Sequence, residues 1–168
     1  DISELNLYQI DSEINEKNNV IPILGDCCNR VFIRNLFKRY KVDILIHAAA
    51  YKHVPLVEAN PIIAISNNIL STKVICEAAY EFNLEKLILV SSDKAVRPTN
   101  IMGATKRVSE LIVQSYADKL NKKTNMKDKN SKSSSFSMVR FGNVLNSSGS
   151  VVPLFKKQIK KGGPITLT

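Results

Sequence analysis

The sequence lacks the features that define several common protein classes. It has three cysteines, two of them adjacent (Cys27 and Cys28), and only two histidines, with no C-x-x-C spacing. This pattern favours neither a disulfide framework nor a zinc site, and we read the cysteines as thiols in a reducing compartment. No stretch approaches the roughly 18 apolar residues of a membrane span, and no signal-peptide pattern opens the sequence. We therefore predict a soluble piece of chain.

Glycine-rich loops are also missing. None of the six glycines forms G-x-G-x-x-G, the turn that cradles the phosphates in a dinucleotide-binding fold. The sequence opens instead with Asp1 followed directly by a helical pattern. In a dinucleotide-binding unit an acidic residue that binds the adenosine ribose ends the second strand. Asp1 has that place if the first strand, the glycine loop, the first helix and the second strand precede it; otherwise it is a helix-capping aspartate.

Positive charge is what the sequence has in excess. The net charge is +9, and ten of the 24 basic residues lie in two short segments, at 119–132 and 156–161. The first segment is low in complexity and has no aromatic residue, which is typical of a solvated loop. Without aromatic residues among the charges we do not predict nucleic-acid binding. An anionic ligand or an acidic membrane surface remains as an alternative.

Short apolar runs alternate with helical patterns along the whole chain. Apolar runs at 20–26, 42–50, 86–92 and 135–145 predict strands, and amphipathic patterns predict helices at 3–17, 29–40, 60–80, 100–120 and 153–161. The chain ends on the beginning of a further strand, PITLT. The alternation predicts an α/β fold, with a parallel sheet covered by helices on both faces. Ligands bind such sheets at the carboxyl ends of the strands, which here fall at 25–26, 48–53, 91–94 and 140–143.

Five motifs together resemble one family. They are LGD at 24–26, HAAAYKHVPLVE at 47–58, NNILST at 67–72, SSDKAVRPTNIMGATKR at 91–107 and VRFGNVLNSSGSVVPLFKKQI at 139–159. In this order and spacing they are similar to the polysaccharide-biosynthesis branch of the extended short-chain dehydrogenases/reductases, which contains the UDP-N-acetylglucosamine 4,6-dehydratases. The match covers almost the whole chain.

The resemblance implies a Rossmann-like, doubly wound parallel sheet that is incomplete here. The first βαβ unit and most of the C-terminal substrate domain would be absent. Residues 1–150 would be a partial dinucleotide-binding domain with a Lys/Ser-rich loop at 119–135, and residues 151–168 would begin the substrate-binding part.

The resemblance also implies a cofactor, NAD or NADP, and residues that hold it. Asp26 and Cys27 would lie against the adenine, and Asn68 would help to hold the catalytic lysine through water. Three small residues and a lysine would line the cofactor: Ala48, Ala49, Ala50 and Lys52. Without the resemblance, the alanines indicate close packing of a strand against a helix, and Asn68 would face solvent.

Asp93 and Lys94 would carry most of the chemistry. A 4,6-dehydratase oxidises the sugar at C4, removes the C5 proton, eliminates water from C6 and returns the hydride to C6. Lys94 is our candidate base and Asp93 the candidate acid for the leaving hydroxyl, and each needs a pKa shifted toward neutrality. The alternative is an ordinary surface ion pair. Ser92 would contact the C4 oxygen, and Lys106 would bind the nicotinamide ribose and stabilise developing negative charge.

Met102 stands where many relatives have a tyrosine that acts as acid and base. It lies one helical turn before Lys106 and has no proton to give. Part of the family has methionine here, so the sequence resembles that subgroup. The group that takes the C4 hydroxyl proton is left open between Asp93, Lys94 and a water held by Lys106. Met102 itself is predicted to pack against ligand or in the core.

The remaining candidate residues concern the nucleotide sugar. Arg140, Gly142 and Asn143 would close the site, with Asn143 contacting the substrate. Val152, Pro153 and Phe155 would border the uridine. Asn146 departs from the family, which commonly has glycine there, and this puts the geometry of its loop in doubt.

The function implied is the central segment of an NAD(P)-dependent UDP-GlcNAc-type 4,6-dehydratase in bacterial surface polysaccharide biosynthesis. The alternatives are a nucleotide-sugar 4-epimerase or reductase of the same superfamily, and a nucleotide-binding module without turnover. The partners implied are a UDP-sugar and further copies of the intact chain, without nucleic acid. The intact protein would be cytoplasmic, with the option of a membrane anchor outside this stretch that holds it at the inner face of the membrane.

Overall fold

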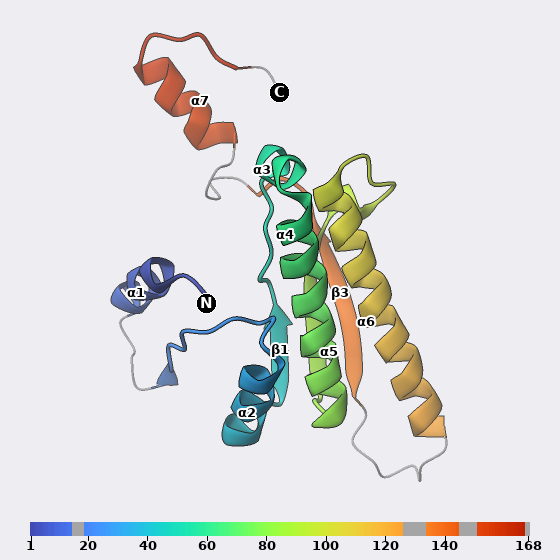
Figure 1. Ribbon diagram of the computed structural model, residues 1–168. Helices are drawn as coiled ribbons and strands as arrows, with labels where there is room; N and C mark the ends of the chain where they lie inside the picture. The colour runs from blue at the N-terminus through green and yellow to red at the C-terminus, as the bar shows by residue number, and fades with distance from the viewer. Residues whose placement is uncertain (15–18, 126–133, 145–150, 167–168) are drawn as a thin grey trace.

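A three-stranded parallel sheet forms the centre of the structure (Figure 1). The computed structural model describes residues 1–14, 19–125, 134–144 and 151–166. Its strands are β1 (Ile44–His47), β2 (Lys86–Ser92) and β3 (Ser135–Phe141), in the order β1-β2-β3. Because all three run in the same direction, their carboxyl ends lie at one edge of the sheet, at the top in Figure 1. The prediction of a parallel α/β fold is confirmed.

The helices that build the core lie on one face of this sheet (Figure 1). They are α2 (Arg30–Tyr40), α5 (Ser71–Glu81) and α6 (Ile101–Asn125). Side chains alternate between the two faces of a strand, and the register places Leu45, Leu87 and Phe136 side by side toward these helices. We call this side of the sheet the covered face.

The opposite side, which we call the open face, differs from the prediction. We expected helices on both faces, but in the described residues the open-face side chains of β1 and β3 stay exposed, and those of Ile88 and Val90 in β2 are half-buried. Ile44 and Ile46 are 56% and 65% exposed, and Val139 and Phe141 are 39% and 47% exposed. The apolar runs of β1 and β3 therefore supply two apolar faces, of which the described helices cover one.

The predicted strand at 20–26 is wrong, because this segment has no regular structure. Two hydrogen bonds still have the parallel-strand pattern: the Asp1 nitrogen donates to the Ile23 oxygen at 3.0 Å, and the Gly25 nitrogen donates to the Asp1 oxygen at 2.9 Å. A strand needs a continuous partner along its length, and among the described residues only Asp1 pairs with this segment in that way.

The helix predicted at 60–80 is present in three parts: α4 (Pro61–Ile65), a π-helical turn η2 (Ser66–Leu70) and α5. By length and apolar composition alone, Pro61–Glu81 would pass for a membrane span. Half of its most apolar window is buried inside the structure, as in a core helix. Two shorter elements were not predicted, α3 (Val54–Ala59) and the 3₁₀ turn η3 (Asp93–Ala95).

Two other helices differ in length from their predictions. α1 is shorter, spanning Glu4–Glu13, whereas α6 is longer and reaches Asn125, so the predicted loop at 119–135 begins inside a helix. Lysines at the end of α6 have partners: Lys123 donates to the Asn83 side chain at 3.0 Å, and Lys119 lies over the Tyr116 ring. Positive charge in the last turn of a helix also interacts favourably with the helix dipole.

At the C-terminal end, α7 (Val151–Lys160) matches the predicted helix. The strand expected in PITLT is absent at 164–166, and the last two residues lie outside the described part. The domain boundary at 150/151 and Asn146 also touch undescribed residues, and they stay predictions.

Candidate functional site

The residues that follow β2 and β3 meet at the carboxyl edge of the sheet. The Ser92 hydroxyl donates to the Asp93 carboxylate at 2.9 Å, and the Lys94 ammonium donates to the same carboxylate oxygen at 3.2 Å. Lys94 also reaches the side-chain oxygen of Asn143, just beyond β3, at 3.4 Å. The structure therefore brings together four of the predicted site residues: Ser92, Asp93, Lys94 and Asn143.

The acid–base properties of Asp93 differ from the prediction. Hydrogen bonds from Ser92 and then Lys94 lower the pKa of Asp93, and its side chain is 54% exposed. We expected a pKa raised toward neutrality, as an acid for a leaving hydroxyl requires, and that expectation is wrong for the structure as it stands. Asp93 is an ionised acceptor at neutral pH, because both neighbours stabilise its charged form.

Lys106 approaches the same edge from α6. Its side chain is buried, and its ammonium donates to the Val90 carbonyl of β2 at 2.9 Å. Burial lowers the pKa of Lys106, and the nearby Glu110 carboxylate opposes that shift. A buried amine close to the edge suits a group that stabilises developing negative charge.

The first turn of α6 lies directly against Lys94. A Cβ on Gly103 would lie 2.2 Å from the Lys94 carbonyl oxygen, so only glycine permits this approach. Two acceptors fix the start of the helix: the Asn100 side chain accepts from the Gly103 nitrogen at 2.8 Å, and Glu58 accepts from the Ile101 nitrogen. The start of α6 is thereby held beside η3.

Met102 packs in the core. It is 3% exposed and belongs to a small cluster with Val57 and Ala64, against which Val54 and Ile101 pack. Of the two alternatives for this position, ligand contact or core, its surroundings favour the core.

Arg140 is engaged differently from the prediction. Its Nε and Nη2 donate to the two carboxylate oxygens of Glu110 at 2.8 Å and 2.7 Å. The planar fork of the guanidinium is thereby matched to a carboxylate within the protein itself. Arg140 thus joins β3 to α6, and its predicted place at the substrate stays a prediction.

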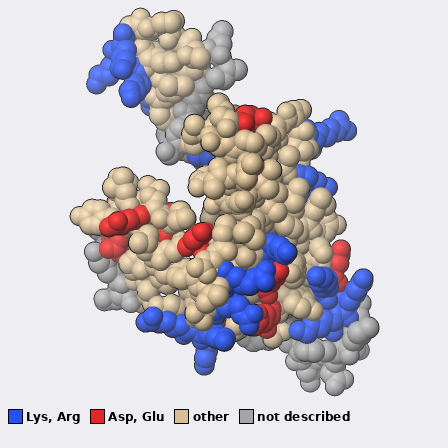
Figure 2. Space-filling view, in the orientation of Figure 1, with Lys and Arg blue, Asp and Glu red and all other residues tan. Residues whose placement is uncertain are grey.

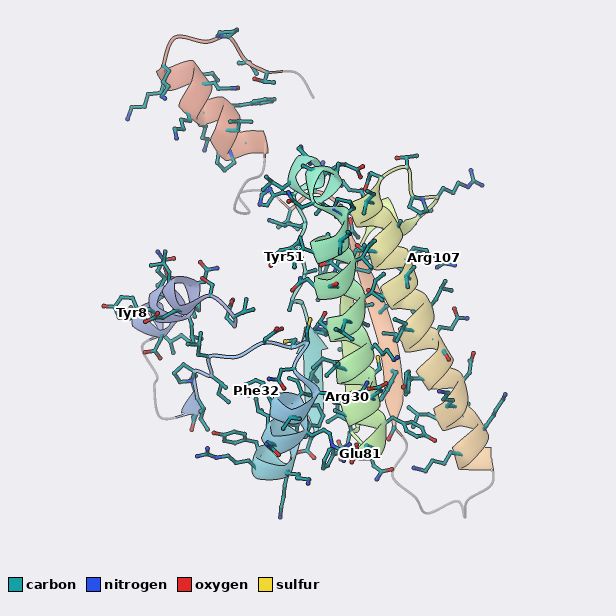
Figure 3. The ribbon with its side chains drawn as sticks, viewed as in Figure 1. Tyr8, Arg30, Phe32, Tyr51, Glu81 and Arg107 are labelled. Atoms are coloured by element: carbon teal, nitrogen blue, oxygen red, sulfur yellow. The ribbon has the colours of Figure 1, made fainter. Side chains whose placement is uncertain are left out.

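Asn68 is buried, with 2% of its surface exposed, and it lies in the π-helical turn. Its side chain accepts from the Tyr51 nitrogen at 2.8 Å and donates to the Tyr51 oxygen at 3.1 Å and to Thr105 at 2.9 Å. Its carbonyl accepts from Thr72 and Ser109 at 2.8 Å and 3.0 Å. These contacts fix the loop after β1, which Tyr51 labels in Figure 3. The predicted water-held contact of Asn68 with Lys106 stays a prediction.

The other residues expected at the cofactor lie at the ends of their segments. Ala48 and Ala49 are exposed just beyond β1, Ala50 is half-buried, and Lys52 is exposed. Asp26 turns back on its own loop and accepts from the Cys28 nitrogen at 2.7 Å. Burial raises the pKa of the Cys27 thiol. The roles of these residues at the cofactor stay predictions.

The residues expected at the uridine are not brought to this edge. Pro153 is exposed and Val152 and Phe155 are half-buried on α7, which lies apart from the sheet (Figure 1). Two open cavities in the described structure also lie elsewhere. One, of about 320 Å³, lies between α1 and residues 20–23 and includes Asp1; the other, of about 380 Å³, lies beside Phe37 and Phe82. Neither is lined by Asp93, Lys94 or Lys106, so the candidate site is not one of these cavities.

Two buried polar residues lie on the covered face, and sequence reasoning missed the first of them, Glu110. Glu110, one turn beyond Lys106, is 1% exposed and accepts from Ser91 at 2.7 Å and from Arg107 at 3.0 Å, besides Arg140. These hydrogen bonds, Arg140 first, lower the pKa of Glu110 to about 2. His47 is 4% exposed, and burial lowers its pKa to about 4. The i, i+4 spacing of Lys106 and Glu110 was the available signal for the first residue.

Part of the excess positive charge lies away from this site. Figure 2 shows basic side chains near the lower end of the sheet and on α7. Lys38 and Arg39 end α2, and Lys122 and Lys123 end α6, both at the edge opposite to the carboxyl ends of the strands. These four basic residues and the candidate site therefore lie at opposite ends of the sheet.

Comparison with known proteins gives matches along the whole chain. The family described as "Polysaccharide biosynthesis protein" matches residues 1–168. The capsular polysaccharide biosynthesis protein CapD of Staphylococcus aureus is 45% identical over 98% of this chain and 26% of its own length. An inverting UDP-N-acetylglucosamine 4,6-dehydratase of Campylobacter jejuni is 41% identical over 87% of this chain and 44% of its own length.

A solved structure agrees with the fold. The structure of Pen from Bacillus thuringiensis is 36% identical, with a TM-score of 0.85 over 99% of this chain and 49% of that one. The fold is therefore the expected Rossmann-like one. The chain spans about a quarter to a half of the length of the proteins that it matches here.

Proposed function

The chain belongs to the polysaccharide biosynthesis protein family, and from that premise we propose that the protein containing it is an NAD(P)-dependent nucleotide-sugar 4,6-dehydratase. The substrate that we propose is a UDP-GlcNAc-type sugar, as the name of the Campylobacter jejuni relative supports. One observation carries the proposal: the Lys94 ammonium lies between the Asp93 carboxylate and the Asn143 amide, at 3.2 Å and 3.4 Å.

The residues present fit a nicotinamide cofactor. Exposed alanines beyond β1 and a buried lysine on α6 both lie at the carboxyl edge of a parallel sheet, where such ligands bind. Ala48, Ala49, Ala50 and Lys106 would hold the cofactor, with Asp1, Asp26, Cys27 and Lys52 as further candidates. When bound, the cofactor would supply reversible hydride transfer. NAD and NADP are both consistent with these residues.

Lys94 is the proposed base at C5 of the sugar. To act so it must lose its proton, and the approach of a substrate that displaces Asn143 or Asp93 would separate it from groups that favour its charged form. Asp93 can act as the acid for the C6 hydroxyl only after it has taken up a proton. The C4 hydroxyl proton, for which Asp93 is one of the acceptors left open, would supply it once substrate has displaced the hydrogen bonds from Ser92 and Lys94 that keep Asp93 ionised. Proton transfer of this kind contributes about 10²–10⁴-fold.

Two other groups would act at C4. Ser92 would bind the C4 oxygen, and the ammonium of Lys106 would stabilise charge that develops there. The acceptor of the C4 hydroxyl proton remains Asp93, Lys94 or a water held by Lys106. Met102 takes no part in proton transfer, since it is a core residue without a titratable group.

We further propose that the intact protein works in the cytoplasm in surface polysaccharide biosynthesis, as the name of the Staphylococcus aureus relative supports. An anchor at the inner face of the membrane, outside this stretch, and self-association belong to the same proposal. The alternatives are an epimerase or reductase of the same superfamily and a binding module without turnover.

One experiment separates these functions. The intact protein is incubated with UDP-N-acetylglucosamine and NAD or NADP, and the product is analysed by NMR. A 4-keto-6-deoxy sugar that is lost in Lys94→Ala and kept in Lys38→Ala, an exposed lysine of α2, supports the dehydratase. A sugar inverted only at C4 would contradict it and indicate an epimerase. Cofactor binding without any product would indicate a binding module.

A further inference from the structure

Every acceptor position of the buried Glu110 carboxylate is filled. One oxygen accepts from the Ser91 hydroxyl at 2.7 Å and from Arg140 Nε at 2.8 Å. The other accepts from Arg140 Nη2 at 2.7 Å and from Arg107 Nη1 at 3.0 Å. A carboxylate offers about four such positions, so this group is saturated. Its partners come from β2, β3 and α6, and Glu110 therefore joins three elements at one point.

The register of the sheet explains why these partners converge. Ser91 of β2 is paired with Arg140 of β3, so both side chains leave the sheet on the covered face, toward α6. Glu110 is thus hydrogen-bonded to Ser91 and Arg140, and three residues further along each strand the chain reaches Lys94 and Asn143, which contact each other. Hydrogen bonds and these two short stretches of chain together form a closed ring.

Lys106 lies on the same face of α6, one turn before Glu110, and it contacts the residue before Ser91. Its ammonium donates to the Val90 carbonyl at 2.9 Å, while Glu110 accepts from Ser91. Two adjacent turns of α6 are therefore attached to two adjacent residues of β2. Both turns move together with the end of that strand.

We propose that Glu110 is a positioning residue that sets the distance between the Lys106 amine and the Asp93–Lys94 pair. It acts through Ser91 and Arg140, and its consequence for catalysis rests on the dehydratase function proposed above. Charge-assisted, two-pronged contacts hold geometry more tightly than neutral ones. A displacement of about 1 Å between groups that act on one substrate costs on the order of 10²-fold in rate.

The test compares Glu110→Gln with Glu77→Gln in the intact protein. Glu77 is a matched control, because it also pairs with an arginine (Arg30, 2.8 Å) but on the α2–α5 side. The glutamine side chain keeps the shape of the glutamate and loses its charge. We expect kcat to fall about 10–100-fold, with KM for the nucleotide sugar within about threefold of wild type. Glu110→Asp, which keeps the charge, should recover part of kcat.

Amide hydrogen exchange gives a readout that needs no activity. In Glu110→Gln, exchange at 90–94 and 139–143 should rise about tenfold or more, while the rest of β2 stays protected. Glu77→Gln should leave both segments unchanged. If Glu110→Gln does not fold, Ser91→Ala and Arg140→Gln each remove one partner and should show the same pattern.

Wild-type exchange at both segments, together with an unchanged kcat, overturns the proposal. A loss of stability that leaves kcat per folded molecule unchanged also overturns it. If the wild type makes no keto sugar but exchange responds as expected, the attachment of α6 to β2 and β3 stands and the dehydratase function fails.

Discussion

The two faces of the sheet are built from similar residues but have different surroundings. On the covered face, Leu87 and Leu89 are each 1% exposed under α5 and α6. On the open face, Ile46 and Phe141 are 65% and 47% exposed, although the strands are as apolar there. The polar residues Ser91, His47 and Arg140 all extend from the covered face, where they meet α5 and α6.

The difference shows that an apolar strand does not by itself produce a core. Burial stabilises a side chain by about 25 cal/mol per Å² of apolar surface removed from water, and in the part of the chain that the structure describes the helices of the core remove it on the covered face. The candidate site depends on that face, since Lys106 and Glu110 reach β2 from α6. Substitutions on the two faces should therefore have unequal effects.

The largest effect is expected for Leu89→Ala on the covered face. The change removes buried methyl groups at a position that is 1% exposed and leaves a cavity. The free energy of unfolding should fall by about 3 kcal/mol, within the usual range of 2–5. Urea denaturation followed by circular dichroism measures it, and a loss below 1 kcal/mol would mean that this core is loosely packed.

Acid should lower the free energy of unfolding in two stages, each caused by a buried group on the covered face. The native pKa of His47 is about 4, below its ordinary 6.5, so its contribution is complete above pH 6.5 and is lost as pH falls toward 4. The native pKa of Glu110 is about 2, below its ordinary 4.5, so its contribution is complete above pH 4.5 and is lost toward pH 2. Each stage is worth roughly 3 kcal/mol.

Urea unfolding at a series of pH values tests both stages. His47→Gln should abolish the loss between pH 6.5 and 4 and keep the lower one. A variant that still loses the same stability in the upper range would show that His47 does not cause it.

Gly103→Ala should have a somewhat smaller effect on stability and a clear effect on activity. The added Cβ would lie 2.2 Å from the Lys94 carbonyl, so α6 or η3 must move. Overpacking of this kind costs about 1–3 kcal/mol. In the intact protein, turnover should fall with it, whereas Ala104→Gly, on the exposed side of the same turn, should only weaken the helix by about 1 kcal/mol. Unchanged turnover in Gly103→Ala would show that the position of η3 does not affect the rate of the reaction.

The smallest effect is expected for Ile46→Thr on the open face. Ile46 is 65% exposed, and threonine also favours strands, so the free energy of unfolding of this chain should change by less than about 0.5 kcal/mol. The same denaturation experiment as for Leu89→Ala measures it. A loss close to that of Leu89→Ala would contradict the distinction between the faces.

Local sequence patterns predicted the helices and strands well, and they predicted the tertiary contacts of these elements less well. The helices at 60–80 and 100–120 and the strand before Asp93 were predicted because apolar periodicity is a local property. The strand at 20–26 failed since a strand exists only with a partner, and in the described residues only Asp1 pairs with it. Motif resemblance placed Ser92, Asp93, Lys94 and Asn143 at one edge, but it could not give the pKa of Asp93, which depends on two hydrogen bonds.

The sequence by itself determined the order of strands and helices, the parallel sheet that follows from it, and the edge where polar residues gather. Those properties depend on side-chain periodicity and on short connections, which are written along the chain. Only the tertiary structure decided which apolar face is buried, that Arg140 binds Glu110, and that Asn68 holds the Tyr51 loop. Such choices depend on distances between residues far apart in the chain, and no local pattern contains them.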